Sequence, residues 1–192
     1  MKKIIFMLTT MFLLASCAGN QTEKTDAEPD FAPADFEYKV DRFADIEILR
    51  YYVPGFNSLS LKQKELVYYL SQAALEGRDI LWDQHNSLNL TIRRVCEAVY
   101  ENYMGDKNSE NWKNFETYLK QNWMANGVHH HYSEDKIIPA FPQEYFVTIV
   151  NSVDPGRMPF RDGMAADETL SEILPLMFDP TVQPKRMNQA AG

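Results

Sequence analysis

A run of consecutive histidines gives this chain its clearest candidates for chemistry. His129, His130 and His131 precede Tyr132 and are three of only four histidines in the sequence. Neutral imidazole binds transition metals, so the run raises the question of a metal site. If the segment after Gly127 is extended, alternate side chains point to opposite faces, which places His129 and His131 together. Two histidines hold a metal weakly and no third ligand is evident, so an ordinary polar surface competes with a weak metal site.

Sequence motifs of other well-understood active sites are missing. The 192 residues contain no His-Glu-x-x-His, Cys-x-x-Cys, Walker, Gly-x-Ser-x-Gly or dinucleotide-binding pattern. Carboxylate pairs such as Asp41 and Asp45 have a spacing that any solvated helix surface can show. The residues alone therefore assign no catalytic group and no bound metal.

Composition favours one globular domain with an acidic surface. Hydrophobic residues make up 45% of the chain and aromatic residues 12%, which is enough for a sizeable core. The formal net charge is -8, and no basic stripe offsets it. We therefore expect no nucleic-acid partner.

The N-terminus is typical of a secreted bacterial lipoprotein. Residues 1–16 combine two lysines with a short apolar run, too short for a comfortable membrane span. The tetrad LASC, which ends at Cys17, resembles the lipobox in which the cysteine is acylated. Residues 17–36 are polar and proline-containing, which predicts a flexible tether. We expect a lipid-anchored protein of the cell envelope; a simple signal peptide with a chance cysteine is the alternative.

A long amphipathic helix is predicted from Leu61 to Asp83. Ser60 and Gln63 fit a capping box at its start. Apolar residues then recur at three- and four-residue spacing, as on one helix face. That face comprises Leu66, Tyr69, Leu70, Ala73, Ala74 and Leu81.

Two further helices are predicted in the sequence before the histidine run. One is predicted from Leu90 to Tyr103, and the other begins after Ser109 and ends at Asn126-Gly127. Short helices are also expected at Arg42–Tyr51, Gln143–Val150 and Asp167–Met177, with a loop from Asn151 to Gly163. The residues predicted to face inward are Ile92, Val95, Cys96 and Val99 in the first helix, and Trp112, Phe115, Leu119 and Trp123 in the second.

Three tyrosine clusters invite a ligand-binding interpretation but are more typical of core and core edge. They are Tyr51-Tyr52, Tyr68-Tyr69, and Tyr100 with Tyr103. All these patterns together predict a predominantly α-helical domain.

Long phrases of the sequence support a family resemblance. The run FADIEILRYYVPGFNSLSLKQKELVYYLSQAALEGRDILWDQHNSLNLTIRRVCEAVYENY, followed by LKQNWMANGVHHHYSEDKIIPAFPQEYF, resembles the N-terminal region of bacterial dipeptidyl-peptidase III. That family comprises zinc metallopeptidases with two lobes around a wide cleft, which release dipeptides from the N-terminus of oligopeptides. The resemblance implies an α+β, predominantly α-helical fold, in which residues 37–192 form the N-terminal part of the lower lobe, with a few short strands, in a chain truncated at its C-terminus.

The resemblance places catalysis outside this sequence. The family's zinc motif, His-Glu-x-x-Gly-His, does not occur here, and zinc is a cofactor of the full-length enzymes. We expect this chain to hold no zinc and to be inactive alone. A non-enzymatic, lipid-anchored helical binding domain is the alternative function.

For the histidine run, the resemblance implies contact with substrate. The segment corresponds to a lower-lobe strand that borders the cleft, where His131 and Tyr132 line the subsites for the first residues of an oligopeptide. His129 is expected beside them. Ordinary polar surface and a weak metal site stay open as alternatives.

Overall fold

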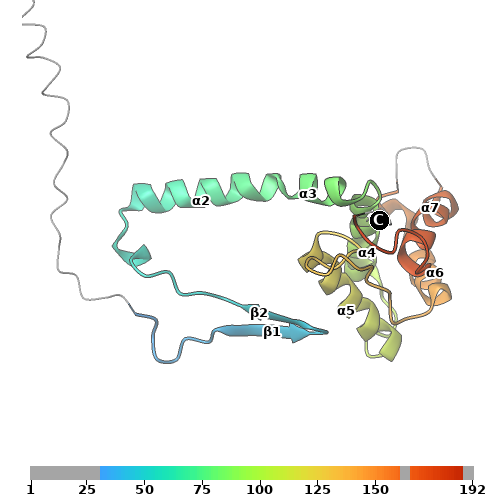
Figure 1. Ribbon diagram of the computed structural model, residues 1–192, viewed down its shortest axis with the longest axis horizontal. Coiled ribbons are helices and arrows are strands. Elements are labelled where there is room, and N and C mark those ends of the chain that lie inside the picture. Colours follow the sequence, from blue (N-terminus) through green and yellow to red (C-terminus); the bar gives the residue numbers. More distant parts are fainter. Residues whose placement is uncertain (1–30, 161–164, 188–192) are drawn as a thin grey trace, which may run out of the picture.

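The computed structural model describes residues 31–160 and 165–187, which are predominantly helical with one small antiparallel sheet. Figure 1 shows a helical body from which a long arm extends. The predicted signal segment, Cys17 and most of the predicted tether lie outside the described residues. The elements are β1 (Lys39–Phe43), β2 (Ile46–Leu49), α2 (Leu61–Glu76), α3 (Arg78–His85), α4 (Asn89–Asn102), α5 (Glu110–Ala125), α6 (Gln143–Asn151) and α7 (Ala166–Phe178), with 3₁₀ turns at Phe56–Ser58 and Pro155–Arg157.

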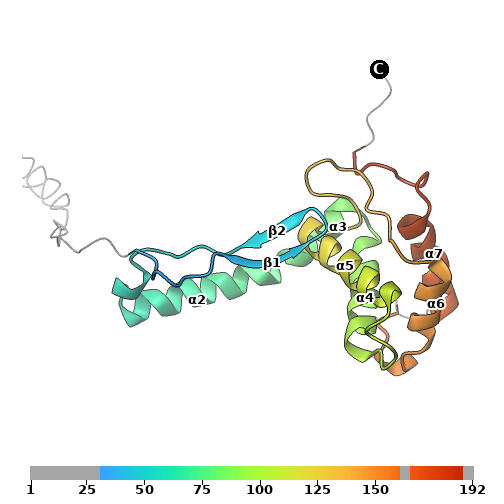
Figure 2. The same ribbon diagram turned by 90° about the horizontal axis from the view of Figure 1, so that it is seen from below.

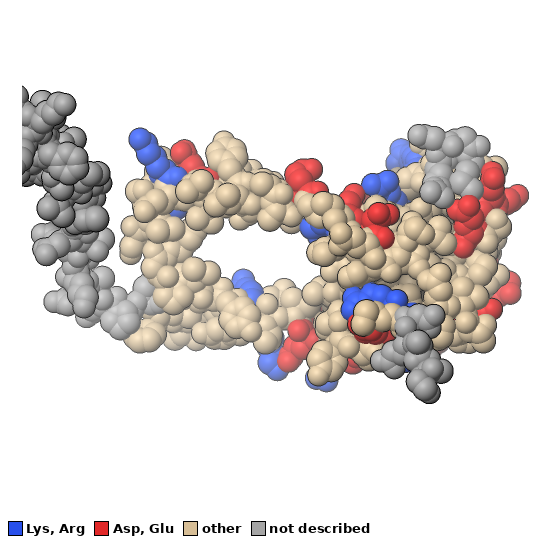
Figure 3. Space-filling view, turned by 45° about the horizontal axis from the view of Figure 1, so that its top comes forward, with Lys and Arg blue, Asp and Glu red and all other residues tan. Residues whose placement is uncertain are grey.

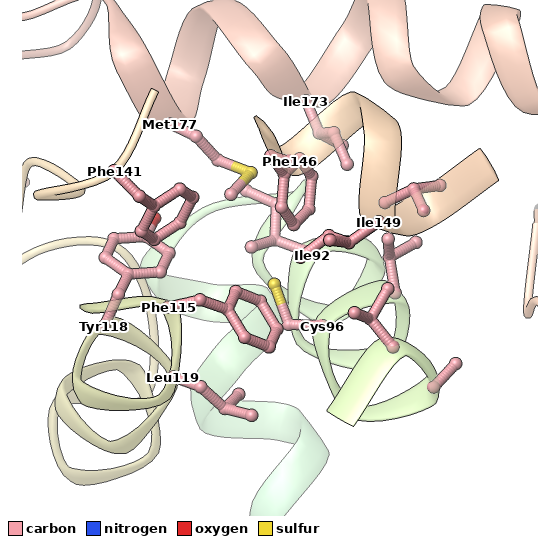
Figure 4. Close-up of a cluster of buried hydrophobic side chains, with 14 of the residues drawn as sticks. Ile92, Cys96, Phe115, Tyr118, Leu119, Phe141, Phe146, Ile149, Ile173 and Met177 are labelled. Carbon is pink, nitrogen blue, oxygen red and sulfur yellow. The ribbon is translucent and has the colours of Figure 1, made fainter. Parts of the chain in front are cut away.

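The body is built by α4 to α7 around one hydrophobic core. Figure 4 shows Cys96 of α4 beneath Phe146 of α6, with α7 closing the far side. The inward faces predicted for α4 and α5 are confirmed, except that Trp123 is only half-buried. The largest fully buried side chains are Trp82, Tyr118, Phe115, Phe146, Ile92, Leu119, Ile149, Ile173, Leu176, Met177, Val95 and Val99.

Local signals set the ends of α5. The Ser109 hydroxyl accepts a hydrogen bond from the Trp112 amide at 3.3 Å, which satisfies one free N–H of the first turn. At the other end Asn126 is left-handed, with φ 54 and ψ 45, and Gly127 has φ 145. These two residues turn the chain out of the helix and into the histidine segment.

The helix predicted from Leu61 to Asp83 is divided in two. The Ser60–Gln63 capping box is present, so the predicted start is confirmed. Gly77 interrupts the helix, and α3 continues to His85 in nearly the same direction (Figure 1).

The helix predicted at Arg42–Tyr51 is wrong, because these residues belong to the β1–β2 hairpin. Phe43 pairs with Ile46 across a turn in which Ala44 has φ 47. In β2 the isoleucines are half-buried while Glu47 and Leu49 are exposed, which is the two-residue alternation of a strand. The short segment satisfied a loose helical spacing, but its alternation is that of a strand.

Residues 31–77 form the arm, and no residue of the described segment 31–81 is buried. Of the 21 large hydrophobic side chains that are exposed among the described residues, 16 lie between Phe31 and Leu81, so the apolar face predicted for α2 exists but is uncovered. Tyr51, Tyr68 and Tyr69 are exposed, which contradicts their predicted position in the core or at its edge. Tyr100 and Tyr103 lie at the core edge, as predicted, where both rings stack on Trp112. Figure 3 shows an opening between the side of the arm that contains α2 and the side that contains the β1–β2 hairpin.

The arm is joined to the body through α3. Trp82, the first buried residue of the described chain, lies under the guanidinium of Arg93, whose Cζ is 5.3 Å from the ring centroid. Asp79 pairs with Arg93 at 2.6 Å and with Arg94 at 3.1 Å. These contacts attach α3 to α4. Among the described helices, none has the length and apolarity needed to cross a membrane.

Candidate functional site

The histidine run lies in a tight turn, residues 128–137, here called the histidine turn. Its two sides are joined by hydrogen bonds from the Ile137 amide to the Val128 carbonyl and from the His130 amide to the Asp135 carbonyl, both at 2.8 Å. The chain reverses after His130, where the Glu134 amide bonds to the His130 carbonyl. The alternation assumed for an extended segment therefore ends at His130.

His129 is the buried histidine of the turn, and its ring contacts the segment that follows α7. Only 3% of the residue is exposed, and its Nε2 lies 2.8 Å from the Gln183 carbonyl oxygen. Because a carbonyl only accepts, Nε2 carries the proton, and the buried Nδ1 has no partner among the described residues. Burial lowers the pKa of His129, and the positive charges of Lys136 and Arg186 lower it further.

His130 uses both ring nitrogens. Nδ1 accepts hydrogen bonds from the amides of Tyr132 at 3.2 Å and Ser133 at 3.1 Å. Nε2 lies 3.3 Å from Oδ2 of Asp45, at the tip of the β1–β2 hairpin. The ring thus connects the tip of the hairpin with the backbone of the turn.

His131 and Tyr132 occupy the tip of the histidine turn. Both are exposed, Tyr132 to 87%. The His131 ring lies against that of His130, with centroids 4.4 Å apart. The His131 imidazole and the Tyr132 phenol are therefore exposed to solvent, on a backbone that the hydrogen bonds of the turn and of His130 hold in place.

A second set of residues supports the turn from the segment that follows α7. The Lys136 amide bonds to the Pro184 carbonyl, and the Arg186 amide bonds to the Glu134 carbonyl. The side chains of Arg186 and Glu134 pair at 2.7 Å, and Arg186 also reaches Nε2 of His85 at 3.3 Å. Sequence reasoning missed these residues, because His85 and Arg186 are 101 positions apart and no local pattern connects them.

Asn89 fixes the entry to the turn and was also missed. This buried side chain donates to the Trp82 carbonyl and accepts from the Val128 amide, both at 3.2 Å. Gly127 packs directly on it, so a larger residue has no room there. Because this buried side chain forms hydrogen bonds with two separate backbone segments, it fixes the position of α3 relative to the turn.

The described residues do not fit a zinc site. No group of three or more His, Cys, Asp or Glu side chains converges within them. Each of the three histidines other than His131 already has a hydrogen-bonding partner. A groove of about 530 Å³ between α6 and α7 is lined by Gln143, Ser171, Leu174, Pro175, Phe178 and Asp179, which suggest no chemical step.

Comparisons leave the sequence resemblance as the only indication of family. No family model matches the chain, and no curated protein matches it. The resemblance to dipeptidyl-peptidase III therefore stays a prediction, as does the role of the histidine turn.

Proposed function

We propose that this chain is the N-terminal part of the lower lobe of a zinc-dependent dipeptidyl peptidase of the dipeptidyl-peptidase III type. In this proposal the histidine turn contacts the first residues of an oligopeptide substrate. The supporting observation is that a well-bonded turn exposes His131 and Tyr132, while the other histidines are engaged with protein groups. A rigid backbone lowers the entropy lost when a peptide binds.

The two exposed side chains suit peptide recognition. The Tyr132 hydroxyl can both donate and accept a hydrogen bond, and the neutral His131 ring has one donor and one acceptor. An extended peptide offers amides and carbonyls that match these groups. The burial of His129 favours a supporting role for this residue over the direct contact predicted from the sequence.

The uncovered arm also supports the proposal. Contiguous exposed apolar side chains often mark a surface that another polypeptide or a membrane covers. In a two-lobed peptidase, later segments of the same lobe would cover them. The side chains that bind zinc, and the glutamate that polarises the zinc-bound water, would also come from later segments, so this chain contributes binding and positioning alone.

The gene offers the cheapest test. An open frame that continues past codon 192 into a His-Glu-x-x-Gly-His pattern supports the proposal, and a stop codon at that point overturns it. The complete product should release dipeptides from a dipeptidyl-arylamide, whereas residues 17–192 alone should not.

The role of the turn is tested in the complete enzyme by the double variant His131→Ala/Tyr132→Ala. It removes an aromatic contact and one or two hydrogen bonds, each worth about 1 kcal/mol. We expect kcat/KM to fall roughly 10- to 100-fold with zinc content unchanged. Met104→Ala, at a residue 93% exposed on the body, serves as the control. Unchanged kcat/KM in the double variant would remove the turn from the binding site, and loss of zinc would mean that it holds the metal.

A lipid-anchored binding domain without enzymatic activity is the second candidate. It is favoured by the exposed aromatic side chains of the arm, Tyr51, Tyr68 and Tyr69. A stop codon after residue 192, together with a monomeric and cooperatively folding chain, would decide for this candidate.

A further inference from the structure

The arm returns to the body at the tip of the β1–β2 hairpin. Lys120 of α5 pairs with Asp41 at 3.0 Å, and its ammonium lies 5.5 Å from the centroid of the Phe43 ring. Asp45 reaches His130 on the adjacent histidine turn. Figure 2 shows the hairpin tip at this side of the body, close to α5. Asp45 and His130 are 85 positions apart in sequence and meet in a carboxylate–imidazole contact.

The hydrogen bonds of His130 determine which of its ring nitrogens carries the proton in the contact with Asp45. Its Nδ1 accepts from two backbone amides, so it carries no proton, and the proton of the neutral ring resides on Nε2. This is the nitrogen that faces Asp45. A carboxylate beside the N–H of one ring nitrogen stabilises that tautomer and orients the ring. Asp45 therefore favours the form of His130 that can hold the amides of Tyr132 and Ser133.

We propose that Asp45 is a positioning residue for the histidine turn and acts through His130. By selecting the tautomer and orientation of His130, the hairpin tip determines how firmly the exposed His131–Tyr132 pair is held. The arm is thereby coupled to the surface that contacts substrate. This inference rests on the proposed function for its consequence in catalysis, but the coupling itself is a property of the fold.

The exposure of the two side chains sets the expected strength of the contact between Asp45 and His130. The side chain of Asp45 is 65% exposed and that of His130 is 20% exposed, so the pair resembles a surface pair. Such pairs contribute about 0.2–1 kcal/mol, which corresponds to roughly 1.4- to 5-fold in an equilibrium constant. We expect a change of that size in the opening of the turn when Asp45 is removed.

Amide hydrogen exchange in the complete protein tests the coupling without reference to activity. In Asp45→Ala, the amides of Tyr132 and Ser133 should exchange roughly 1.4- to 5-fold faster, and the nitrogen-15 spectrum of His130 should show a weaker preference for the Nε2–H tautomer. Asp45→Glu should restore both. Glu47→Ala is the matched control, because Glu47 lies in the same hairpin and pairs with Lys39 at 2.8 Å instead of with the body.

Two changes at His130 separate its nitrogens. His130→Asn keeps an acceptor near the position of Nδ1 but lacks a group at Nε2, so Asp45→Ala should add nothing in that background. His130→Gln keeps a donor near Nε2 but loses the acceptor, so the two amides should exchange fast whatever residue stands at 45.

The outcomes separate this inference from the proposed function. Unchanged exchange in Asp45→Ala, or an equal change in Glu47→Ala, overturns the coupling even if His131→Ala/Tyr132→Ala lowers kcat/KM. Faster exchange with wild-type kcat/KM supports the coupling and counts against substrate contact by the turn. Faster exchange with a 1.4- to 5-fold lower kcat/KM supports both.

Discussion

His129 and Tyr132 lie three positions apart, yet one residue is 3% exposed and the other 87%. The difference comes from the reversal of the chain after His130, which turns Tyr132 outward and leaves His129 against the segment that follows α7. Residues a few positions apart therefore have different structural environments. His129 and His130 stabilise the turn, and His131 and Tyr132 are free to contact a ligand.

At the residue scale, His129 should make stability depend on pH. Its pKa is lowered in the folded state, so the unfolded state takes up a proton first as the pH falls. The stabilisation is complete above the ordinary pKa of 6.5 and is lost as the pH drops through the folded value. His129→Gln can still donate to the Gln183 carbonyl but does not titrate, so its unfolding temperature should fall less between about pH 7 and about pH 5. Thermal unfolding across this range measures the difference, and equal pH slopes for the two proteins would contradict the assignment.

At the element scale, the junctions between helices explain where the histidine turn is placed. Gly77 links α2 to α3 with ordinary right-handed helical angles, φ -78 and ψ -7. Gly127 links α5 to the turn with φ 145, and the space beside it is filled by the amide of Asn89. The first junction tolerates a side chain, whereas the second requires glycine for both its angles and the close approach.

Matched alanine substitutions test this contrast. Gly127→Ala should lower the free energy of unfolding by about 1–3 kcal/mol or more, since the new methyl group strains the backbone and displaces Asn89. Gly77→Ala should raise it by about 0.4–1 kcal/mol, because it restricts the unfolded chain without a clash. Denaturant unfolding measures both. A similar loss in the two variants would show that helix continuity, and not the contact with Asn89, controls stability.

At the scale of the whole molecule, the arm and the body differ in how their apolar residues are used. The body buries its helical faces, whereas α2 has no buried residue despite its tyrosines and leucines. A solvated helix of this kind gains little from packing, which is the main source of helix stability in proteins. The arm is thus suited to being covered by further polypeptide.

Leu70 tests whether the arm is covered in the complete protein. It is 60% exposed in this chain, so Leu70→Gln should change the stability of residues 17–192 by less than about 0.5 kcal/mol. In a complete protein that covers α2, the same change should cost about 1.5–3 kcal/mol. Ile92→Ala, in the core of the body, should cost about 2–5 kcal/mol in both. Equal, small effects of Leu70→Gln in both proteins would mean that α2 stays solvated.

The anchor proposed for the whole molecule depends on Cys17, which lies outside the described residues. Cells given a clickable palmitate analogue should label the wild-type protein, and Cys17→Ser should abolish the label. The physical reason is that the lipid would be attached through the sulfur of Cys17, which serine lacks, and the buried chains would then hold the protein on the membrane. Equal labelling of the two proteins would remove the lipoprotein assignment.

The sequence by itself determined most helices of the body and the start of α2 in the arm, because their signals are local. Capping by Ser60 and Ser109 and the three- and four-residue spacing of Ile92, Val95, Cys96 and Val99 act within one or two helical turns. The buried state of Cys96 followed from the same spacing. The hairpin was missed because its strands are short, and a few apolar residues in a short segment satisfy either period.

Only the tertiary structure decided what each histidine does and which apolar face is covered. His129, His130 and His85 each have a partner that is distant in sequence: Gln183, Asp45 and Arg186, respectively. The apolar spacing of α2 resembles that of α4, but α4 meets α5 and α6 while α2 extends away from the body. A local pattern specifies which residues share a face; contact between distant segments determines whether that face is buried and whether a polar side chain is held or free.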